Sequence, residues 1–392
     1  MTANIENESV ANANPSFIKR INEIENYLKQ GDNDLLIRRL LDLCLDSQQQ
    51  SYLQQAINIS TQFNSKKTVD DLLYQNINTL LKQVQNFLPK NVANFSSKNL
   101  FTASQIKKQY SKGNFSLHAL STSIKPGEII GIVGENGNGK TTLLRSLARE
   151  LSIDDGLLQF DMLNNPDDFT IKHHVAFIPQ RIPKWYGLLK DNLHFSASLS
   201  GIKGSENDLM VNFMLERLNL TKFANLTWNQ ISSGYRTRFE IARVLLQKPQ
   251  LLILDEPLAN LDIAAQQTIL TDLQFLAKST YNPMGIVLSS QQLHEVEKVA
   301  DDILFLKQGK LLYQSKNAES SKEFVIEVET QSPKEKLQQC FTNEEVQIGF
   351  NGGFYTLQST SLSHIQMLEL LIQNSIEINY FRNISNSTKR FF

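Results

Sequence analysis

Cysteine is scarce in this chain, and its two cysteines, Cys44 and Cys340, lie in separate regions. Neither belongs to a Cys-x-x-Cys pair or to another metal-binding spacing, so a zinc site or a redox centre built on cysteine pairs is excluded. A single disulfide between Cys44 and Cys340 is the remaining alternative, but two cysteines are too few for a framework of several disulfides. We therefore expect a reducing, cytoplasmic environment.

Long apolar runs are also absent. No segment approaches the ~18–20 apolar residues that a helix needs to cross a bilayer. Residues 1–15 are polar and lack the basic-then-apolar layout of a secretion signal. We expect a soluble protein for which any membrane role must come through a partner.

A surplus of charge of either sign is missing as well. The formal net charge is −1, with 39 basic and 40 acidic residues, so nothing global predicts binding to nucleic acid or to an anionic membrane. The hydrophobic share of 41% over 392 residues is sufficient for packed cores in two or three domains.

Three blocks follow along the chain. Residues 1–96 are rich in Gln, Asn and Leu at helical spacing, and they predict a helical bundle whose apolar faces pack together or in part dock a partner. Residues 97–318 alternate strands with helices, the α/β pattern of a mostly parallel sheet. Residues 319–392 predict a small third domain.

The clearest helix of the first block starts near Thr68 and ends before Pro89. Its apolar stripe consists of Val69, Leu72, Leu73, Ile77, Leu80, Leu81, Val84, Phe87 and Leu88.

The most informative motif is G-x-x-x-x-G-K-T at residues 134–141, between a predicted strand and a predicted helix. Glycine lets the backbone turn tightly and approach an anion, and the helix N-terminus adds a positive dipole. Lys140 is expected to reach the β- and γ-phosphates of a nucleotide, and Thr141 to hold Mg²⁺. The predicted nucleotide-binding residues here are Gly134, Glu135, Asn136, Gly137, Asn138, Gly139, Lys140, Thr141 and Thr142.

Two acids follow a second apolar run, residues 251–254. A buried strand would present Asp255 and Glu256 at its carboxyl end, where open α/β sheets bind ligands. Asp255 can hold Mg²⁺ directly, or through Thr141 and water. Glu256 can polarise the attacking water as a general base.

Ser232, Ser233 and Gly234 open another predicted helix and form a second anion site. One chain needs only one γ-phosphate site of its own, so the second suggests a partner's nucleotide. Residues 231–235 resemble the Leu-Ser-Gly-Gly-Gln signature of the ATP-binding-cassette (ABC) ATPases, and the ordered motifs extend this resemblance over most of residues 97–318.

The resemblance implies a P-loop NTPase fold, ATP and Mg²⁺ as cofactors, and ATP hydrolysis by a homodimer or by a pair with a paralogous second cassette. It identifies Gln180 as the Q-loop glutamine, with catalytic and Mg²⁺-binding roles. Residues 259–262, from Ala259 through Asn260 and Leu261, correspond to the D-loop, in which Asp262 contacts nucleotide. Tyr110 would stack on adenine, with Phe115 as the alternative.

Some positions depart from the family pattern. Ser233 replaces a glycine of the signature, and Tyr235 replaces its glutamine. The switch histidine falls on Gln291, whose amide can hydrogen-bond a γ-phosphate but cannot carry an imidazolium charge. We expect Gln291 to keep that contact in a catalytic role and to lower the hydrolysis rate without abolishing it. His294, three residues further on, is expected to be a packing or surface residue.

The last block predicts the order β-α-β-β-α-β of a ferredoxin-like α+β domain. The predicted elements are a strand at 324–328, a helix at 333–341, a hairpin of 346–350 and 354–357 around 351–353, a helix containing 365–371, and a strand beginning at Ile376. This order resembles the small C-terminal domain of exporter-type ABC ATPase subunits, which also end in a short Ser-rich segment like residues 384–387.

Two functions remain open. The first is the energising subunit of an ABC transporter, an exporter, acting on a separate integral membrane subunit. The second is a soluble ABC ATPase that regulates or remodels a macromolecule. Residues 181–186 mix basic and aromatic side chains, which suits nucleic acid. The resemblance instead places this segment against the membrane partner, so no nucleic acid is expected, and Trp185 is alternatively a core residue.

Overall fold

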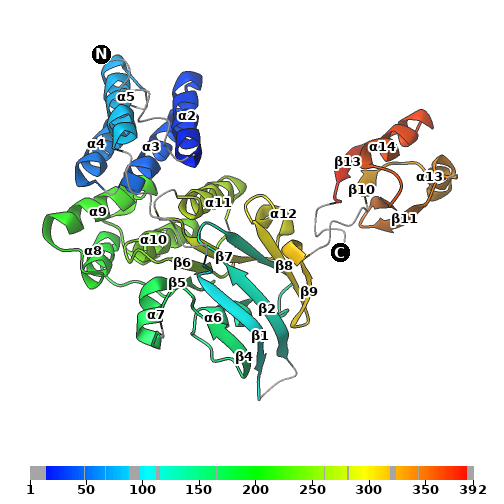
Figure 1. Cartoon of the computed structure of the whole chain (residues 1–392). Helices are drawn as coiled ribbons and strands as arrows, with labels where there is room; N and C mark the ends of the chain where they lie inside the picture. Colours follow the sequence, from blue (N-terminus) through cyan, green and yellow to red (C-terminus); the bar gives the residue numbers. More distant parts are fainter. Residues whose placement is uncertain are drawn as a thin grey trace, which may run out of the picture.

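The computed structural model describes residues 15–47, 49–66, 68–87, 98–111, 115–164, 166–259, 261–279, 282–317, 324–342 and 344–385. The elements fall into three groups along the chain (Figure 1). The proposed boundaries at 96/97 and 318/319 lie outside the described residues, as do Pro89 and Asn260. Within the described ranges, no helix combines the length and apolarity needed to span a bilayer.

The first group is a bundle of helices, which the spacing of apolar residues predicts. Its members are α2 (Pro15–Gln30), α3 (Asn33–Ser47), α4 (Gln50–Lys66) and α5 (Asp71–Asn86). Two details of α5 differ from the sequence prediction. The helix begins after Asp70, not at Thr68, because the Asp70 carboxylate accepts the Leu73 N–H at 2.9 Å. Leu72 is 63% exposed, because it lies off the buried stripe that Leu73 and Ile77 occupy.

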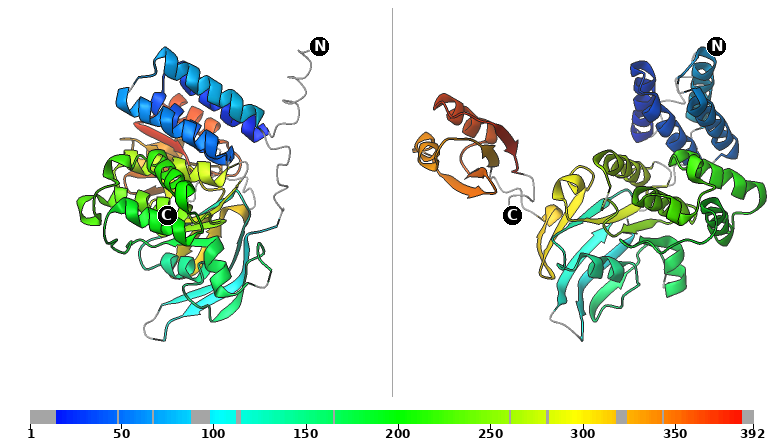
Figure 2. Two further views of the ribbon diagram at one scale, coloured as in Figure 1. Left: turned by 90° about the vertical axis from the view of Figure 1, so that its left-hand side faces the viewer. Right: turned by 180° about the vertical axis from the view of Figure 1, so that it is seen from behind.

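The bundle rests on the cassette (Figures 1 and 2). Its contacts are with α9 (Gly204–Arg217) and α11 (Ile263–Ala277), and its apolar residues belong to the same buried cluster as theirs. Polar contacts cross the same boundary. The Ser60 hydroxyl donates to Glu216 at 2.7 Å, and an Arg20 guanidinium N–H donates to the Phe275 carbonyl at 2.9 Å. The bundle is therefore packed on the cassette through both apolar and charged residues.

The middle group contains two sheets. A six-stranded sheet has the order β5-β6-β7-β3-β8-β9, parallel except for the antiparallel pairing of β8 with β9. A three-stranded antiparallel sheet has the order β2-β1-β4. The strands are β1 (Phe101–Gln109), β2 (Ser116–Ile124), β3 (Ile129–Val133), β4 (Asp155–Gln159), β5 (Val175–Ile178), β6 (Leu251–Leu254), β7 (Gly285–Ser290), β8 (Asp302–Lys307) and β9 (Lys310–Gln314).

Helices cover both faces of the larger sheet. The remaining helices of this group are α6 (Lys140–Leu147), α7 (Asp168–His174), α8 (Leu189–Leu199), α10 (Ser233–Leu245) and α12 (Leu293–Val296). Alternate strand residues enter two separate cores, Leu251 on one face and Leu252 on the other. The α6 helix shares its core with the three-stranded sheet, whereas α10 and α11 share the core of the opposite face. The helices after β3 and before β6 are thus separated by the sheet.

The C-terminal group has the predicted order of elements and its own buried core. It comprises β10 (Phe324–Glu329), α13 (Lys334–Cys340), β11 (Val346–Asn351), β12 (Phe354–Ser359), α14 (His364–Gln373) and β13 (Tyr380–Asn383). The antiparallel strand order β11-β12-β10-β13 is that of a ferredoxin-like sheet. The last strand begins at Tyr380, not at the predicted Ile376, because Ile376 is buried in the domain core instead of pairing with β10.

Candidate nucleotide site

The predicted site residues converge at one edge of the parallel sheet. Four neighbouring strands, β5, β6, β7 and β3, end there, and each is followed by a segment that carries predicted site residues. Gln180 follows β5, Asp255 and Glu256 follow β6, Gln291 follows β7, and the loop of residues 134–141 follows β3. Parallel strands place their carboxyl ends at the same edge, which is where such sheets bind ligands.

The loop needs glycine for two separate reasons. Gly139 has φ +96° at the N-terminus of α6, a conformation that favours glycine, and a Cβ there would lie 2.6 Å from Phe115. A Cβ on Gly134 would lie 2.4 Å from the Leu306 carbonyl oxygen. Asn138 fixes the loop from outside, because its side-chain oxygen accepts the Gln308 N–H at 2.9 Å. The Asn138 side chain therefore anchors the loop, and backbone N–H groups are left to hold an anion.

Lys140 is buried, and its ammonium lies under the loop. Nζ donates to the carbonyl oxygens of Gly134 at 2.7 Å and Glu135 at 3.2 Å, and it lies 3.1 Å from Glu256 Oε1. These acceptors hold the ammonium between the loop and the acid at the end of β6. An incoming phosphate oxygen would offer a stronger, charged acceptor at the same place.

Asp255 is held by hydroxyl groups from two directions. Thr141 Oγ1 donates to Asp255 Oδ2 at 2.7 Å, and Ser289 Oγ donates to Oδ1 at 2.8 Å. The Ser289 hydroxyl also accepts the Glu256 N–H at 2.9 Å. Ser289 thus positions both acids, a role that the sequence reasoning missed. The available signal was the position of Ser289 at the end of a buried strand next to β6, where Leu254 pairs with Leu288.

The Glu256 carboxylate contacts residues from several of the segments that form the site. Its Oε2 accepts the amide N–H groups of Gln180 at 2.9 Å and Gln291 at 2.8 Å. Its backbone has φ +48°, a strained conformation for a residue with a side chain, and such strain is concentrated at functional sites. Glu256 therefore contacts both of the other residues predicted to be catalytic, although the three residues follow three different strands.

Tyr110, which is predicted to stack on adenine, and its alternative Phe115 lie beside the loop. Tyr110 is 37% exposed, and its hydroxyl is 3.3 Å from Thr142 Oγ1. The Tyr110 and Phe115 ring centroids are 6.3 Å apart, and Phe115 packs against Gly139. Tyr110 has the more accessible ring, so it remains the better candidate for stacking.

Four predicted nucleotide contacts are not part of this cluster. Ser232 is the residue before α10, and Ser233 and Gly234 form its first turn, on the opposite sheet face from α6. The Asp262 carboxylate caps α11 by accepting the Ala265 N–H at 2.8 Å. The Asp262 side chain therefore stabilises the start of α11.

Two other residues discussed from the sequence are Trp185 and His294. Trp185 is a core residue, as its alternative interpretation predicts: its ring stacks on Trp228 at 5.0 Å between centroids, and its N–H donates to Glu240 at 3.2 Å. His294 is exposed on α12. Tyr186, next to Trp185, is 81% exposed.

The donor set fits a nucleotide with Mg²⁺. The Thr141 hydroxyl and the Asp255 carboxylate are oxygen ligands of the kind that Mg²⁺ takes together with phosphates and water. The loop amides, the N-terminus of α6 and the Lys140 ammonium supply the positive side of a phosphate site. Bound Mg²⁺ would neutralise charge on the β- and γ-phosphates.

Comparison with known proteins supports this assignment. A family model described as "ABC transporter" matches residues 117–259. The SkfA peptide export ATP-binding protein SkfE of Bacillus subtilis is 31% identical over 215 residues, which cover 54% of this chain and 87% of that protein. The phosphonates import ATP-binding protein PhnC of Lactiplantibacillus plantarum is 27% identical over 224 residues, covering 54% and 87%. Among solved structures, cbiO1 of Clostridium perfringens, part of the ABC transporter complex cbiONQ, has a TM-score of 0.50 at 25% identity and covers 55% of this chain and 88% of that one.

Proposed function

Because this chain belongs to the ATP-binding proteins of ABC transporters, we propose that it works as one cassette of a dimer and drives a separate integral membrane protein. The family membership makes the chain an ATP-binding and ATP-hydrolysing P-loop protein. The dimer, the membrane partner and the direction of transport are the proposal.

One observation carries the dimer. The signature residues, Ser232 to Gly234, begin α10 on the opposite sheet face from α6, which follows the phosphate loop. The α10 N-terminus is an anion site that its own loop does not use. In the proposed dimer, a second cassette lies in inverted orientation, and the phosphate oxygens of its ATP contact the α10 N-terminus of the first. Each ATP then lies between the loop of one chain and the α10 N-terminus of the other.

The geometry supports a role for each residue of the cluster. Glu256 takes a proton from the attacking water as the water oxygen bonds to the γ-phosphorus. ADP leaves as the bond between the γ-phosphorus and the β–γ bridging oxygen breaks. Lys140 and the loop amides balance the negative charge on the phosphates. Gln180 and Gln291 orient the Glu256 carboxylate through the hydrogen bonds that they already make.

The transporter role rests on the accessible surface after Gln180. Tyr186 and two residues of α8, Phe195 and Leu199, are at least 66% exposed although they are large and apolar. Such residues favour a protein partner over solvent.

Export is the direction of transport that we propose, because of the ferredoxin-like C-terminal domain, although relatives of both directions exist. A regulatory ATPase acting on a macromolecule is the alternative.

Recovery of the membrane partner tests this role. Tagged full-length chain should isolate one multi-span membrane protein from detergent-solubilised membranes, and that protein should stimulate its ATPase activity. Tyr186→Asp should lose both, because it places a charge in the apolar contact. The matched variant Ile365→Asp, at a 56% exposed position of α14, should retain both. Stimulation by RNA or DNA, with no membrane protein recovered, would favour the alternative function.

Turnover of a Gln291→His variant tests the proposed cause of a slow rate. With ATP bound, Gln291 is expected to hydrogen-bond the γ-phosphate as well as Glu256. An imidazolium at this position would donate a charge-assisted hydrogen bond to the γ-phosphate, which is worth about 1 kcal/mol more than the bond from the amide, or roughly fivefold in kcat. The gain should be larger at pH 6 than at pH 8, because the histidine must be protonated. Gln292→His, at the exposed neighbouring position, is the control and should leave kcat unchanged. A Gln291→His enzyme no faster than the parent at either pH contradicts the proposed role.

A further inference from the structure

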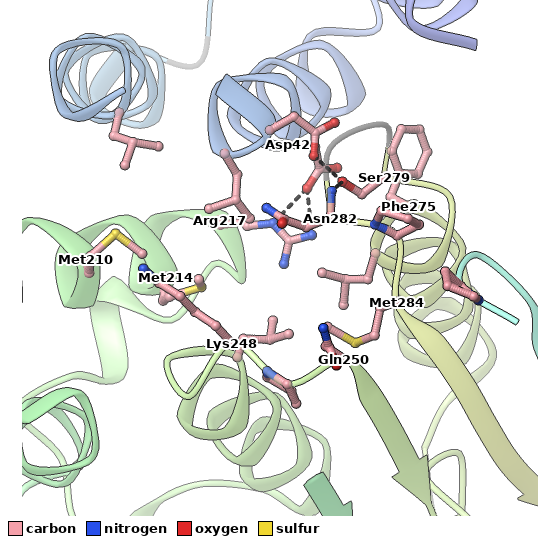
Figure 3. Close-up of a pocket in the computed structure, with 18 of the residues that line it drawn as sticks. Asp42, Met210, Met214, Arg217, Lys248, Gln250, Phe275, Ser279, Asn282 and Met284 are labelled. Atoms are coloured by element: carbon pink, nitrogen blue, oxygen red, sulfur yellow. Dashed lines mark hydrogen bonds and ion pairs between the residues drawn. The ribbon is translucent and has the colours of Figure 1, made fainter. Parts of the chain in front are cut away.

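A cavity of about 330 Å³ lies at the junction of the helical bundle, α9 and α11 (Figure 3). Its volume is within the range of about 300–1,000 Å³ found for small-molecule sites. Gln250 and Met284 form its floor, and they precede β6 and β7. The cavity is therefore at the amino ends of the parallel strands, at the opposite edge of the sheet from the nucleotide site.

The two ends of the cavity differ in chemistry. Figure 3 shows Asp42, Arg217, Ser279 and Asn282 together at the end beneath the bundle. The rest of the wall is mainly apolar, although Glu206 and Lys248 also line it. Its apolar members include Met210, Met214, Leu53, Leu245, Leu276 and Met284. Methionine side chains adapt to the shape of an apolar ligand. A ligand that fills this space has one polar end and one apolar body.

The sign of the polar end follows from the ion pairs. Asp42 is shared by two guanidinium groups: Arg39 Nη1 lies 2.6 Å from Oδ2, and Arg217 Nη2 lies 2.6 Å from Oδ1. Arg20 pairs with Asp46, and Arg38 pairs with Asp272 at 3.4 Å. Four guanidinium groups therefore face three carboxylates. The formal charge of these seven side chains is therefore +1, because Arg39 and Arg217 have only Asp42 between them.

An unused donor marks where an anion would bind. Arg217 is only 3% exposed, and its Nε and Nη2 donate to Asp42. Its third nitrogen, Nη1, is buried and has no hydrogen-bond acceptor within the described ranges. A buried donor without an acceptor is costly, so an anionic oxygen in the cavity would both satisfy the donor and neutralise the surplus charge.

We propose that this cavity binds a small amphiphilic anion, with a carboxylate at Arg217 and an apolar body among the methionines. Its walls come from the bundle, α9 and α11, so the ligand binds only when these elements are packed together. Binding therefore stabilises this arrangement by an amount that grows with ligand concentration. The bundle thereby gains a function separate from ATP hydrolysis, as one wall of a ligand site.

Straight-chain alkanoates from hexanoate to decanoate are the probes, titrated into the full-length chain by calorimetry and by thermal unfolding. Octanoate should bind saturably at one site and raise Tm. Octanol, which has the same tail without the charge, should bind at least tenfold more weakly. Failure of every alkanoate to saturate, or equal affinity for octanol, overturns the proposal.

Two variants locate the binding. Met214→Trp fills the apolar part, and Asn282→Asp adds a negative charge at the exposed edge of the polar end. Each should weaken octanoate binding by about tenfold or more. The matched controls are Met162→Trp and Asn58→Asp, which lie outside the cavity and should stay within about twofold of the parent. If Met214→Trp does not fold, Asn282→Asp decides alone, because its position is exposed. Unchanged binding by Asn282→Asp places the anion elsewhere and overturns the proposal.

Discussion

Replacing Glu256 with glutamine should lower ATP hydrolysis by roughly 10²–10⁴-fold, the usual contribution of a general base. Glutamine has nearly the same shape, and its side-chain oxygen can still accept the N–H groups of Gln180 and Gln291. What it lacks is the basic oxygen that takes the proton of the attacking water. ATP binding should persist, because the loop amides remain and Lys140 loses only its ion pair with Glu256. Phosphate release at saturating ATP and binding of a fluorescent ATP analogue measure the two effects separately.

The same variant tests the composite site. If each ATP is held between two chains and cannot be hydrolysed, the Glu256→Gln protein should accumulate as a dimer in ATP, as seen by light scattering. Glu150→Gln is the matched control, because Glu150 is an exposed carboxylate just beyond the far end of α6 and pairs with Arg145 at 3.7 Å. It should hydrolyse ATP at the parental rate. A Glu256→Gln variant that retains more than about a tenth of the activity would show that another group acts as the base.

Asp42→Asn should destabilise the contact between the bundle and the cassette by about 3–5 kcal/mol, the cost of breaking a buried ion pair. The substitution leaves Arg39 and Arg217 buried without their common counter-charge, and both are at most 3% exposed. Arg39 also lies over the Phe275 ring, with Cζ 3.3 Å from the centroid, so it cannot move to water without breaking this packing. Faster hydrogen exchange of peptides from α3 and α9 in the full-length chain would measure this loss of stability.

Asp70→Asn provides the comparison for Asp42→Asn. It removes a charge from an exposed ion pair with Lys66 in the same bundle, and asparagine can still cap α5. It should cost at most about 1 kcal/mol, as exposed ion pairs do. Equal losses of stability in Asp42→Asn and Asp70→Asn would mean that the buried ion-pair cluster does not hold the bundle in place.

The pH dependence of the Asp42 contribution has a definite sign. Burial by itself raises the pKa of Asp42, but the charges of Arg217, Arg39 and Arg20 more than offset it, and the pKa of the folded state is lowered. The ionised form is therefore favoured by folding. Its contribution is complete above the unfolded-state pKa of about 3.9 and is lost as the pH falls through the lower folded-state value. The difference between parent and Asp42→Asn should thus be the same at pH 5 and pH 7.

Features that depend on neighbouring residues in the chain could be predicted from the sequence. The loop of residues 134–141 needs glycine at fixed spacing, and the hairpin at 351–353 needs residues that accept a turn. The order of elements in the C-terminal domain followed from period-2 and period-3.6 patterns. The exact boundaries of the strands could not be predicted, since a burial pattern does not say where pairing begins. Ile376 has the apolar character of a strand residue, yet it packs in the core before β13 starts.

The sequence by itself determined that this chain binds and hydrolyses ATP, because the motifs of the loop, the two acids and the α10 signature are short and local. Only the tertiary structure decided how these motifs meet. Ser289 joins Asp255 to Glu256, and Gln180 and Gln291 converge on one carboxylate, through the register of adjacent strands. The sharing of Asp42 by Arg39 and Arg217 spans 175 positions of sequence between Asp42 and Arg217. Contacts of this kind arise from packing between distant segments, and no local pattern of residue types encodes them.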